Sequence, residues 1–221
     1  MNPSLMTPKP DKSNDTDEPT LFLIGIDDHL AALLVSMKIR VETFDSVEHF
    51  LSTATVDQPG CIVCEVRVGT GISGFDLLGR LRDRTSDLPV ILVSAAADMS
   101  MALRAVAEGA VTLLSTSSDV QLVWEAVHKG LQLNRNLRIS GAIRREVVAM
   151  ISSLTDREEQ VLRLVTEGHA NKQIAAELGV SLRSVEKWRK EGLEKLNIES
   201  PLQLLRILMR AGFQEWPGRM S

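Results

Sequence analysis

The residues best suited to nucleic-acid chemistry lie between Ser181 and Lys190. This segment holds four cations and one anion, namely Arg183, Lys187, Arg189, Lys190 and Glu186. Lysine can donate to guanine or neutralise phosphate, and glutamate can accept from the cytosine amino group. A bundle helix with solvated lysines is the alternative, but it does not explain why cations crowd one helix. The candidate DNA-binding residues are Lys172, Gln173, Ser181, Arg183, Ser184, Glu186, Lys187, Arg189 and Lys190.

A second set of reactive side chains follows apolar runs in the N-terminal half. Asp27 and Asp28 follow the first run, Glu65 a later one, and Ser94 a third. Carboxylate oxygens are ligands that Mg²⁺ prefers, so Asp27, Asp28 and Glu65 form a residual candidate metal set. The same carboxylates can be solvated or cap a following helix. Both interpretations stay open on this pattern.

Two cysteines, Cys61 and Cys64, have the spacing C-x-x-C, which is found in redox and zinc sites. They lie in GCIVCEV, a β-rich run. Residues three apart on a strand point to opposite faces of a sheet. The sequence therefore predicts two buried structural thiols rather than a shared site.

A helix-turn-helix is predicted to position the cations. Gly179 is placed to end a first helix in a left-handed cap, and Ser181 is an N-cap for a second helix. The apolar face of the first helix is Ile174, Ala175 and Leu178. The second helix is expected to bury Val185, Leu193 and Leu196, with Trp188 packing inward and the cations outward. Two short helices with a glycine in the turn are typical of this motif.

Two further helices are expected around the motif. Thr155 and Glu158 have capping-box spacing, so a helix begins there. Ser200 is the predicted N-cap of a last helix. The residues expected to close the small core from that last helix are Leu204, Leu205, Leu208 and Met209.

Apolar runs alternate with helical stretches from Leu21 to about Gly130. The expected strands are residues 21–27, 39–44, 61–66, 88–94 and 111–115. The expected helices are residues 29–38, 47–54, 75–83 and 101–109, and one from Val120 onward. This order predicts an α/β doubly wound, five-stranded parallel sheet, whose sites lie at the carboxyl ends of the strands.

The helix from Val120 is expected to join this domain to the all-α domain. Trp124, Val127 and Leu131 are predicted to pack on the sheet. Further along, Ile143, Val147, Met150 and Leu154 are spaced 4, 3 and 4 residues apart, like a short coiled-coil seam. Docking on the DNA-binding domain and contact with a second copy explain this spacing equally well.

Charge and composition set the remaining limits. The formal net charge is −4, but the residues from Met150 onward carry eleven Lys/Arg and ten Asp/Glu, and the preceding residues carry fourteen and nineteen. Positive charge is thus local rather than global. The polar segment of residues 1–20 is expected to be a disordered tail. With neither a leader nor a membrane-length apolar run in this sequence, a cytoplasmic location and no membrane contact are expected.

The C-terminal segment, Leu154 to Phe213, resembles the LuxR-type DNA-binding domain. The residues that carry the likeness are LTDREEQVLRLVTEG, NKQIAAELGVS, SVE and EKLN. The resemblance implies that Glu186, Lys187 and Lys190 face the major groove and that Arg189 reaches the DNA backbone. It also implies double-stranded DNA as the partner, a homodimer at least on DNA, and contact with RNA polymerase.

The N-terminal domain resembles the receiver domain of response regulators, and with the C-terminal domain the FixJ/NarL class. The likeness rests on IDD, PGCIVCEVR, ISGFDLL, LPVILVSA and AVAEGAVTLLS. It implies an acidic pair at Asp27 and Asp28 and a sensor at Ser94. The phosphate-accepting aspartate is replaced by Glu65 and the phosphate-binding lysine by Thr116. The first helix is about a turn short for the family, and the loop from Val68 to Gly74 departs from the family pattern.

These replacements predict a receiver that has lost conventional phosphorylation. Glu65 sets its carboxylate one methylene further out, and Thr116 removes a cation that would stabilise transferred phosphate. The expected organisation is a tail (1–20), a receiver-like domain (21–130), a linker helix (131–153) and a helix-turn-helix domain (154–213). The expected protein is a DNA-binding transcriptional regulator and not an enzyme, with no cofactor; Mg²⁺ is not expected.

Two other functions remain open on the sequence. One is a phosphorylation-dependent regulator in a two-component pair. The other is an adaptor that does not bind DNA, which Glu191 and Gly192 favour, because Glu191 would repel phosphate and Gly192 costs helix stability. Glu65 could also imitate a phosphorylated aspartate, although it carries less charge than a phosphate.

Overall fold

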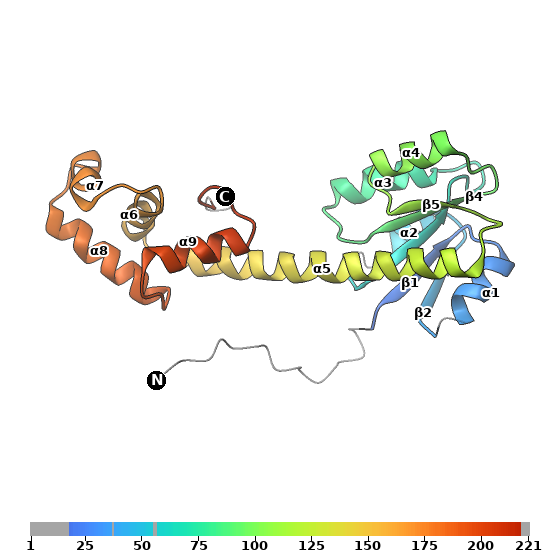
Figure 1. Ribbon diagram of the computed structural model, residues 1–221, viewed down its shortest axis with the longest axis horizontal. Coiled ribbons are helices and arrows are strands. Elements are labelled where there is room, and N and C mark those ends of the chain that lie inside the picture. The colour runs from blue at the N-terminus through green and yellow to red at the C-terminus, as the bar shows by residue number, and fades with distance from the viewer. Residues whose placement is uncertain (1–17, 37, 55–56, 218–221) are drawn as a thin grey trace. The chain divides into compact units, whose positions relative to one another are not determined.

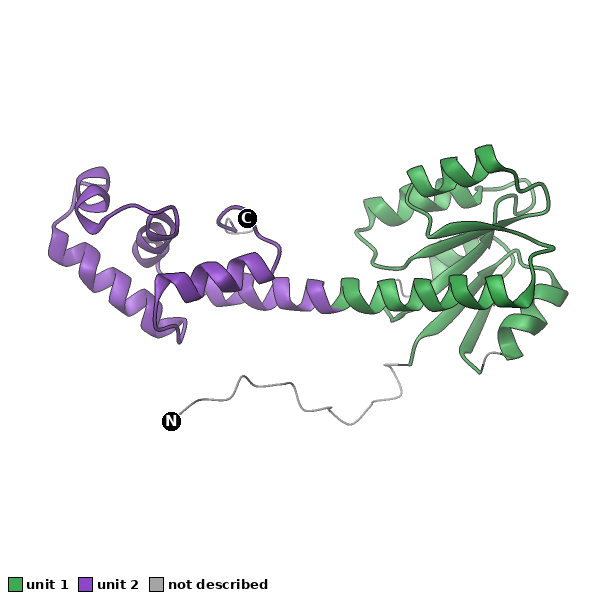
Figure 2. Cartoon of the chain, viewed as in Figure 1, with its two compact units in different colours: residues 1–138 green, residues 139–221 purple. Residues whose placement is uncertain are grey.

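The computed structural model describes residues 18–217, apart from residues 37 and 55–56. The chain divides into two compact units, residues 1–138 and residues 139–221 (Figure 2). The division falls inside the expected linker helix of residues 131–153. The tail predicted over residues 1–20 lies outside the described residues as far as residue 17.

Unit 1 is built on a parallel sheet with the strand order β2-β1-β3-β4-β5. Its strands are β1 (Thr20–Ile24), β2 (Arg40–Phe44), β3 (Gly60–Glu65), β4 (Val90–Ser94) and β5 (Thr112–Ser115). The helices are α1 (Asp28–Ser36), α2 (Val47–Thr53), α3 (Gly74–Asp83), α4 (Met99–Ala107) and α5 (Val120–Ser152), the last of which continues into unit 2 (Figure 1). The predicted doubly wound α/β fold is confirmed.

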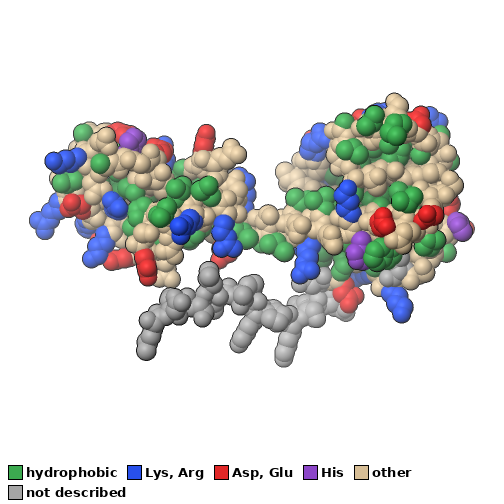
Figure 3. Space-filling model, in the orientation of Figure 1, with side chains coloured by type: hydrophobic (Ala, Val, Ile, Leu, Met, Phe, Trp, Pro, Cys, Tyr) green, Lys and Arg blue, Asp and Glu red, His purple; other side chains and the backbone are tan. Residues whose placement is uncertain are grey.

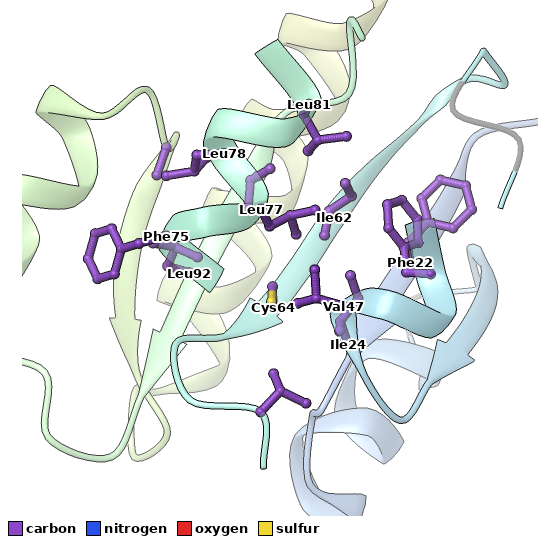
Figure 4. Packing of buried hydrophobic residues seen from close by; sticks show 14 of the residues in the cluster. Phe22, Ile24, Val47, Ile62, Cys64, Phe75, Leu77, Leu78, Leu81 and Leu92 are labelled. Atoms are coloured by element: carbon purple, nitrogen blue, oxygen red, sulfur yellow. The ribbon is translucent and has the colours of Figure 1, made fainter. Parts of the chain in front are cut away.

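The helices cover both faces of the sheet, which explains why the strands read as continuous apolar runs. Helices α2, α3 and α4 pack on one face, and α1 and α5 pack on the other. Figure 4 shows the first core, where Leu77 of α3 lies near Ile62 of β3, with Cys64 further along that strand. Burial of these aliphatic faces is the main force that holds unit 1 together.

Cys61 and Cys64 occupy opposite faces of β3, as predicted. Cys64 belongs to the core under α2, α3 and α4, whereas Cys61 belongs to the core under α1 and α5. Both thiols are free and buried, and burial raises the pKa of each to about 12. A thiol with that pKa is neither a nucleophile nor a metal ligand at neutral pH.

Helix α5 is fixed to the sheet by close packing and by one buried amide. A Cβ atom on Gly130 would lie 2.5 Å from Sγ of Cys61, so the helix approaches β3 too closely for any side chain there. One turn on, Asn134 is 3% exposed. Its Oδ1 accepts from the backbone N–H of Gly60 at 3.0 Å, and its Nδ2 donates to the carbonyl of Asp87 at 2.8 Å.

The predicted apolar face of α5 is right at two positions and wrong at one. Val127 is buried in the core on the sheet, and Leu131 packs partly against it. Trp124 is instead 44% exposed and stacks on His128, with 4.2 Å between ring centroids. The helix turns Val123 toward the sheet, which leaves Trp124 one position further round on the outer surface.

Unit 2 is all-helical, as predicted. It contains the end of α5 together with α6 (Asp156–Thr166), α7 (Asn171–Leu178), α8 (Leu182–Lys195) and α9 (Pro201–Arg210). Thr155 and Glu158 form the expected capping box, and the Ser200 side chain accepts from the backbone N–H of Gln203. Helices α6 and α9 thus start where their capping residues occur in the sequence.

The apolar residues at and just after the end of α5 pack inside unit 2. Val147 and Leu154 are buried in a core with α6, α8 and α9, and Ile143 and Met150 pack partly against it. Docking within the chain therefore accounts for the seam-like spacing.

The expected core face of α9 is wrong in part. Leu204 and Leu208 are buried, but Leu205 is 37% exposed and Met209 is 66% exposed. On a helix, residues next to a buried pair are rotated by about 100°, so only one narrow stripe of α9 reaches the core.

Candidate DNA-binding surface and receiver site

The turn between α7 and α8 is fixed by glycine and by backbone hydrogen bonds. Gly179 adopts φ +64° and ψ +35°, the left-handed conformation expected of a helix C-cap. The next N–H, that of Val180, donates to the carbonyl of Ala175 at 3.0 Å. Ser181 Oγ then accepts from the backbone N–H of Ser184 at 3.1 Å and begins α8. The predicted helix-turn-helix is therefore present.

The side chains of Ser181 and Ser184 interact with each other at the start of α8. Their Oγ atoms lie 2.8 Å apart, in addition to the capping bond. The first N–H groups of a helix attract anions, so this end can approach a phosphate. In the free protein, Ser181 and Ser184 order the start of α8.

Three cations lie on the outer face of α8. Arg183, Lys187 and Lys190 are exposed, and Val185 on the opposite face is completely buried. Figure 3 shows Lys and Arg side chains projecting from the part of unit 2 that contains α8. Lys172 and Glu186 are exposed as well. This face is the candidate DNA-binding surface.

Arg189 differs from the other cations of α8. It is only half-exposed, and its Nη1 donates to Oδ1 of Asn171, the first residue of α7, at 2.9 Å. This bond ties the two helices of the motif together. Asn171 was not among the predicted site residues, because its partner is eighteen positions away and no local pattern connects them.

Two other predicted residues also have local roles. Gln173 accepts through Oε1 from the backbone N–H of Ala170 at 2.8 Å and so caps α7. Trp188 is half-buried against the core of α6, α7 and α8, as predicted, and the guanidinium of Arg157 lies 5.8 Å from its ring centroid. In the free protein Gln173 orders the motif rather than standing free on its surface.

Helix α8 packs on α6 through a buried carboxylate that no sequence pattern indicated as an ion-pair partner. Glu158, known from its capping position, is 3% exposed, and its Oε2 lies 2.7 Å from Nζ of Lys195. Burial alone would raise the pKa of Glu158, but the bonds from Lys195 and Thr155 outweigh it and hold this pKa below its usual value. The pair links the end of α8 to the start of α6.

Gly192 has a packing role in the same contact. A Cβ atom there would lie 2.9 Å from Cδ1 of Leu162, which is completely buried on α6. Any side chain would therefore force the buried Leu162 side chain, or α8 itself, to shift. The helix propensity lost at Gly192 is the consequence of this close approach.

In unit 1 the acidic residues lie at the carboxyl ends of β1 and β3. Asp27 and Asp28 are exposed, and Oδ1 of Asp27 accepts from the backbone N–H of Leu30 at 2.8 Å, which caps α1. Glu65 is half-buried. Burial raises its pKa, and the nearby charge of Asp27 raises it further against opposing backbone hydrogen bonds. The site thus disfavours additional negative charge.

The sensor and lysine positions are held by local hydrogen bonds. Ser94 is 6% exposed, and its Oγ accepts from the backbone N–H of Ala96 at 3.2 Å. Thr116 donates its backbone N–H to the carbonyl of Ser94 at 3.3 Å. Beside it, Oγ of Ser115 and Oγ of Ser117 lie 2.8 Å apart. Neutral hydroxyl groups therefore occupy the position at which the resemblance to receiver domains implies a phosphate-binding lysine.

The altered loop after β3 is anchored by a residue of α2. Oε1 of Glu48 accepts from the backbone N–H of Ile72 at 2.7 Å. Ser73 and Asp76 form a capping box at the start of α3. Glu48 lies twenty-four positions away from Ile72, so the sequence offered no signal for this contact.

A metal set does not assemble at these carboxylates. Over the part of the chain that the structure describes, no group of three or more His, Cys, Asp or Glu residues is arranged to hold an ion. Asp27, Asp28 and Glu65 are therefore not gathered into a three-residue cluster in this structure. Over the same residues, none of the helices is both long and apolar enough to span a membrane.

The chain matches two family models. Residues 25–128 match the response regulator receiver domain, and residues 152–208 match the bacterial regulatory proteins of the luxR family. The two matches fall in the two units, one in each.

Relatives with both parts cover nearly the whole chain. It is 32% identical over 210 residues to the transcriptional regulatory protein TdiR of Thauera aromatica, covering 90% of this chain and 92% of that protein. It is 30% identical over 185 residues to the transcriptional regulatory protein FixJ of Bradyrhizobium diazoefficiens, covering 84% and 90%.

Solved structures of two similar proteins resemble this one. The response regulator StyR has a TM-score of 0.71 at 34% identity, covering 87% of this chain and 99% of that chain. Full-length FixJ from B. japonicum has a TM-score of 0.51 at 28% identity, covering 89% and 98%.

Proposed function

This chain belongs to the FixJ/NarL class of response regulators, and we propose that it binds specific DNA sites without conventional phosphorylation of its receiver. The family makes it a DNA-binding transcriptional regulator with a LuxR-type helix-turn-helix. The residues that read DNA and the state of the receiver are the finer parts of the proposal.

The DNA-reading part rests on the exposed face of α8. Lys187 and Glu186 are exposed on this face, with Arg183 before them and Lys190 after them along the helix. In the proposed complex, Lys187 and Glu186 reach base edges. Lysine donates to N7 and O6 of guanine, and glutamate accepts from N4 of cytosine. Arg189 contributes by holding α8 on α7 through Asn171. The guanidinium has further N–H donors, so Arg189 can contact a DNA phosphate while it keeps the bond to Asn171.

A single domain of this size makes few base contacts, so useful affinity requires two copies. We expect a homodimer on DNA and an operator of two half-sites about one helical turn, ~10 base pairs, apart. A regulator bound in this way would act on transcription through contact with RNA polymerase. DNase I footprinting on sites selected from a random library measures the protected length, and protection of a single half-site by one protomer contradicts the dimer.

The receiver part rests on one observation: two separate components of phosphotransfer are replaced together. Glu65 stands at the acceptor position, where burial and Asp27 already disfavour its charge. Thr116 and its serine neighbours replace the lysine, so a transferred phosphate would have no cation there to offset it. Either change alone would be a weaker argument, because a glutamate carboxylate can itself be phosphorylated in principle.

The deciding experiment measures intact mass after treatment with acetyl phosphate and magnesium. DNA affinity is compared with and without the same treatment. We expect no gain of mass and no change of affinity. A stoichiometric gain of one phosphoryl group together with tighter DNA binding would falsify the proposal.

Phosphorylation-dependent regulation is the second candidate, because Asp27, Asp28 and Ser94 are retained at the strand ends. The same mass measurement decides between the two. The adaptor that does not bind DNA is less favoured. Glu191 lies 3.8 Å from Lys187, and Gly192 packs against Leu162, so both residues have local explanations.

A further inference from the structure

Two lysines on the exposed face of α8 are each paired with a carboxylate one turn further along. Nζ of Lys187 lies 3.8 Å from Oε1 of Glu191, and Nζ of Lys190 lies 3.8 Å from Oε1 of Glu194. The lysines are three positions apart, and so are the glutamates. The two pairs therefore run side by side along the same helix.

These pairs do little for the stability of the helix. Both lysines are about two-thirds or more exposed, and exposed pairs contribute little in water. Lysine precedes glutamate in each pair, which is the less favourable orientation for a pair four residues apart on a helix. At 3.8 Å the atoms are also too far apart for a hydrogen bond. Their main physical effect is to lower the positive potential over α8.

We infer that Glu191 and Glu194 act as an electrostatic brake that weakens binding of α8 to non-specific DNA more than to its own site. This inference rests on the proposed function, since it concerns the same face of α8. It gives the two glutamates a role in sequence discrimination, whereas base contact itself is assigned to other residues.

The brake follows from how the two kinds of complex use lysine. On non-specific DNA, lysines act as point charges near phosphates, and a carboxylate paired with a lysine weakens that attraction by offsetting the charge of its partner. On the specific site, Lys187 instead donates to base acceptors, and this directed bond offsets the loss of its ion pair. Since discrimination is a difference between two affinities, a carboxylate that weakens only the wrong complex increases it.

The test uses the full chain and the variants Glu191→Gln, Glu194→Gln and the double variant. Glutamine has a helix propensity close to that of glutamate, so the helix is preserved while the charge is removed. Glu146→Gln on α5 is the matched control, because it changes the net charge of the chain equally at an exposed position on another helix. Fluorescence anisotropy gives Kd for a duplex selected from a random library and for its scrambled sequence, at several salt concentrations.

For the scrambled duplex, we expect tighter binding by each single variant and the largest effect in the double variant. The slope of log Kd against log salt should steepen by up to about 0.9 per carboxylate removed, or about 3.5-fold in Kd between 50 and 200 mM salt. Kd for the selected duplex should change less, so the ratio of the two affinities falls. Glu146→Gln should leave that ratio unchanged.

A double-mutant cycle tests whether Glu191 acts through Lys187. In a Lys187→Ala background, the effect of Glu191→Gln on the scrambled duplex should shrink, whereas the effect of Glu194→Gln should persist. Equal effects of Glu191→Gln on Kd for the scrambled duplex in both backgrounds would overturn the inference that Glu191 acts through its ion pair with Lys187.

Failure of this inference is distinguishable from failure of the proposed function. If the wild-type protein separates selected from scrambled duplex but the glutamine variants keep the same ratio, the brake is wrong and the proposed function stands. An equal gain on both duplexes, or the same gain with Glu146→Gln, also overturns the brake. If the wild-type protein binds no duplex, both fail together.

Discussion

Oε2 of Glu158, almost completely buried on α6, lies 2.7 Å from Nζ of Lys195 at the end of α8. The same carboxylate accepts from the backbone N–H of Thr155 at 2.7 Å, so one side chain both begins α6 and holds α8 against it. Gly192 lies beside this pair and lets the two helices approach closely. The orientation of α8 on α6 therefore depends on a buried residue outside the proposed DNA-binding surface.

Lys195→Met should destabilise unit 2 by about 1–3 kcal/mol, because it leaves the buried Glu158 carboxylate without its cation. Urea unfolding followed by tryptophan fluorescence measures this in a Trp124→Phe background, which leaves Trp188 and Trp216 as reporters in unit 2. Lys190→Met is the matched control, since its pair is exposed and 3.8 Å long. Equal losses in both variants would contradict a special role for the buried pair.

The same pair predicts a pH dependence. The pKa of Glu158 is held below its usual value, so its contribution to stability is present above the ordinary carboxyl pKa, about pH 4. That contribution is lost as pH falls through the lower pKa of the folded state. The stability difference between wild type and Glu158→Gln should therefore narrow as the solution is acidified. If the stability difference between wild type and Glu158→Gln stayed constant from pH 7 to the lowest pH at which the protein is folded, this linkage would be disproved.

Glu65→Gln should stabilise unit 1 at neutral pH. Burial and the charge of Asp27 raise the pKa of Glu65, so its ionised form costs stability once pH exceeds the ordinary carboxyl range. The gain in the free energy of unfolding should thus grow as pH rises from about 4 to the raised pKa of Glu65, and it should vanish below this range. Thermal unfolding at a series of pH values measures it. Loss of DNA affinity in Glu65→Gln would show instead that Glu65 imitates a phosphorylated aspartate.

Restoring the family residues should restore chemistry only in combination. Glu65→Asp together with Thr116→Lys supplies both the acceptor and the cation, and intact mass after acetyl phosphate treatment should then increase. Glu65→Asp alone should remain unmodified, because transferred charge would still lack the lysine. Phosphorylation of the single variant would show that the lysine position is not limiting.

Lys187→Ala should weaken binding to the selected duplex by ~1–3 kcal/mol and relax preference at one base position. Electrophoretic mobility shifts on the selected site and its single-base variants measure both effects. Lys129→Ala on α5, an exposed lysine of unit 1, controls for the loss of one positive charge. An equal loss on specific and random DNA would identify Lys187 as a phosphate contact.

Asn134→Ala should destabilise unit 1 by ~2–3 kcal/mol, since it leaves the N–H of Gly60 and the carbonyl of Asp87 without their partner in a buried site. Asn134→Asp tests the two bonds separately, because aspartate keeps the acceptor and loses the donor. Hydrogen exchange at Gly60 should rise in the alanine variant and less in the aspartate variant. Unchanged hydrogen exchange at Gly60 in both variants would contradict the role of Asn134 in fixing α5 to the sheet.

The sequence by itself determined the order of elements and most helix ends. Period and composition are local properties, so alternating apolar runs predicted the parallel sheet, and Thr155, Gly179, Ser181 and Ser200 marked the ends of helices. The resemblance to receiver domains predicts replacement of the acceptor and of the lysine, at Glu65 and Thr116, because the motifs that carry it are local too. For the same reason, the opposite faces of Cys61 and Cys64 followed from their spacing on a strand.

Only the tertiary structure decided which side chains meet across the chain. Glu158 with Lys195, Arg189 with Asn171, and Glu48 with Ile72 join residues eighteen or more positions apart, which no local period can pair. Trp124 and Met209 show the same limit, because both were expected to be buried and both are exposed. An apolar stripe indicates which side of a helix faces the core, but not how wide the buried strip is. Burial depends on what the neighbouring elements cover, and that is fixed only when the whole domain packs.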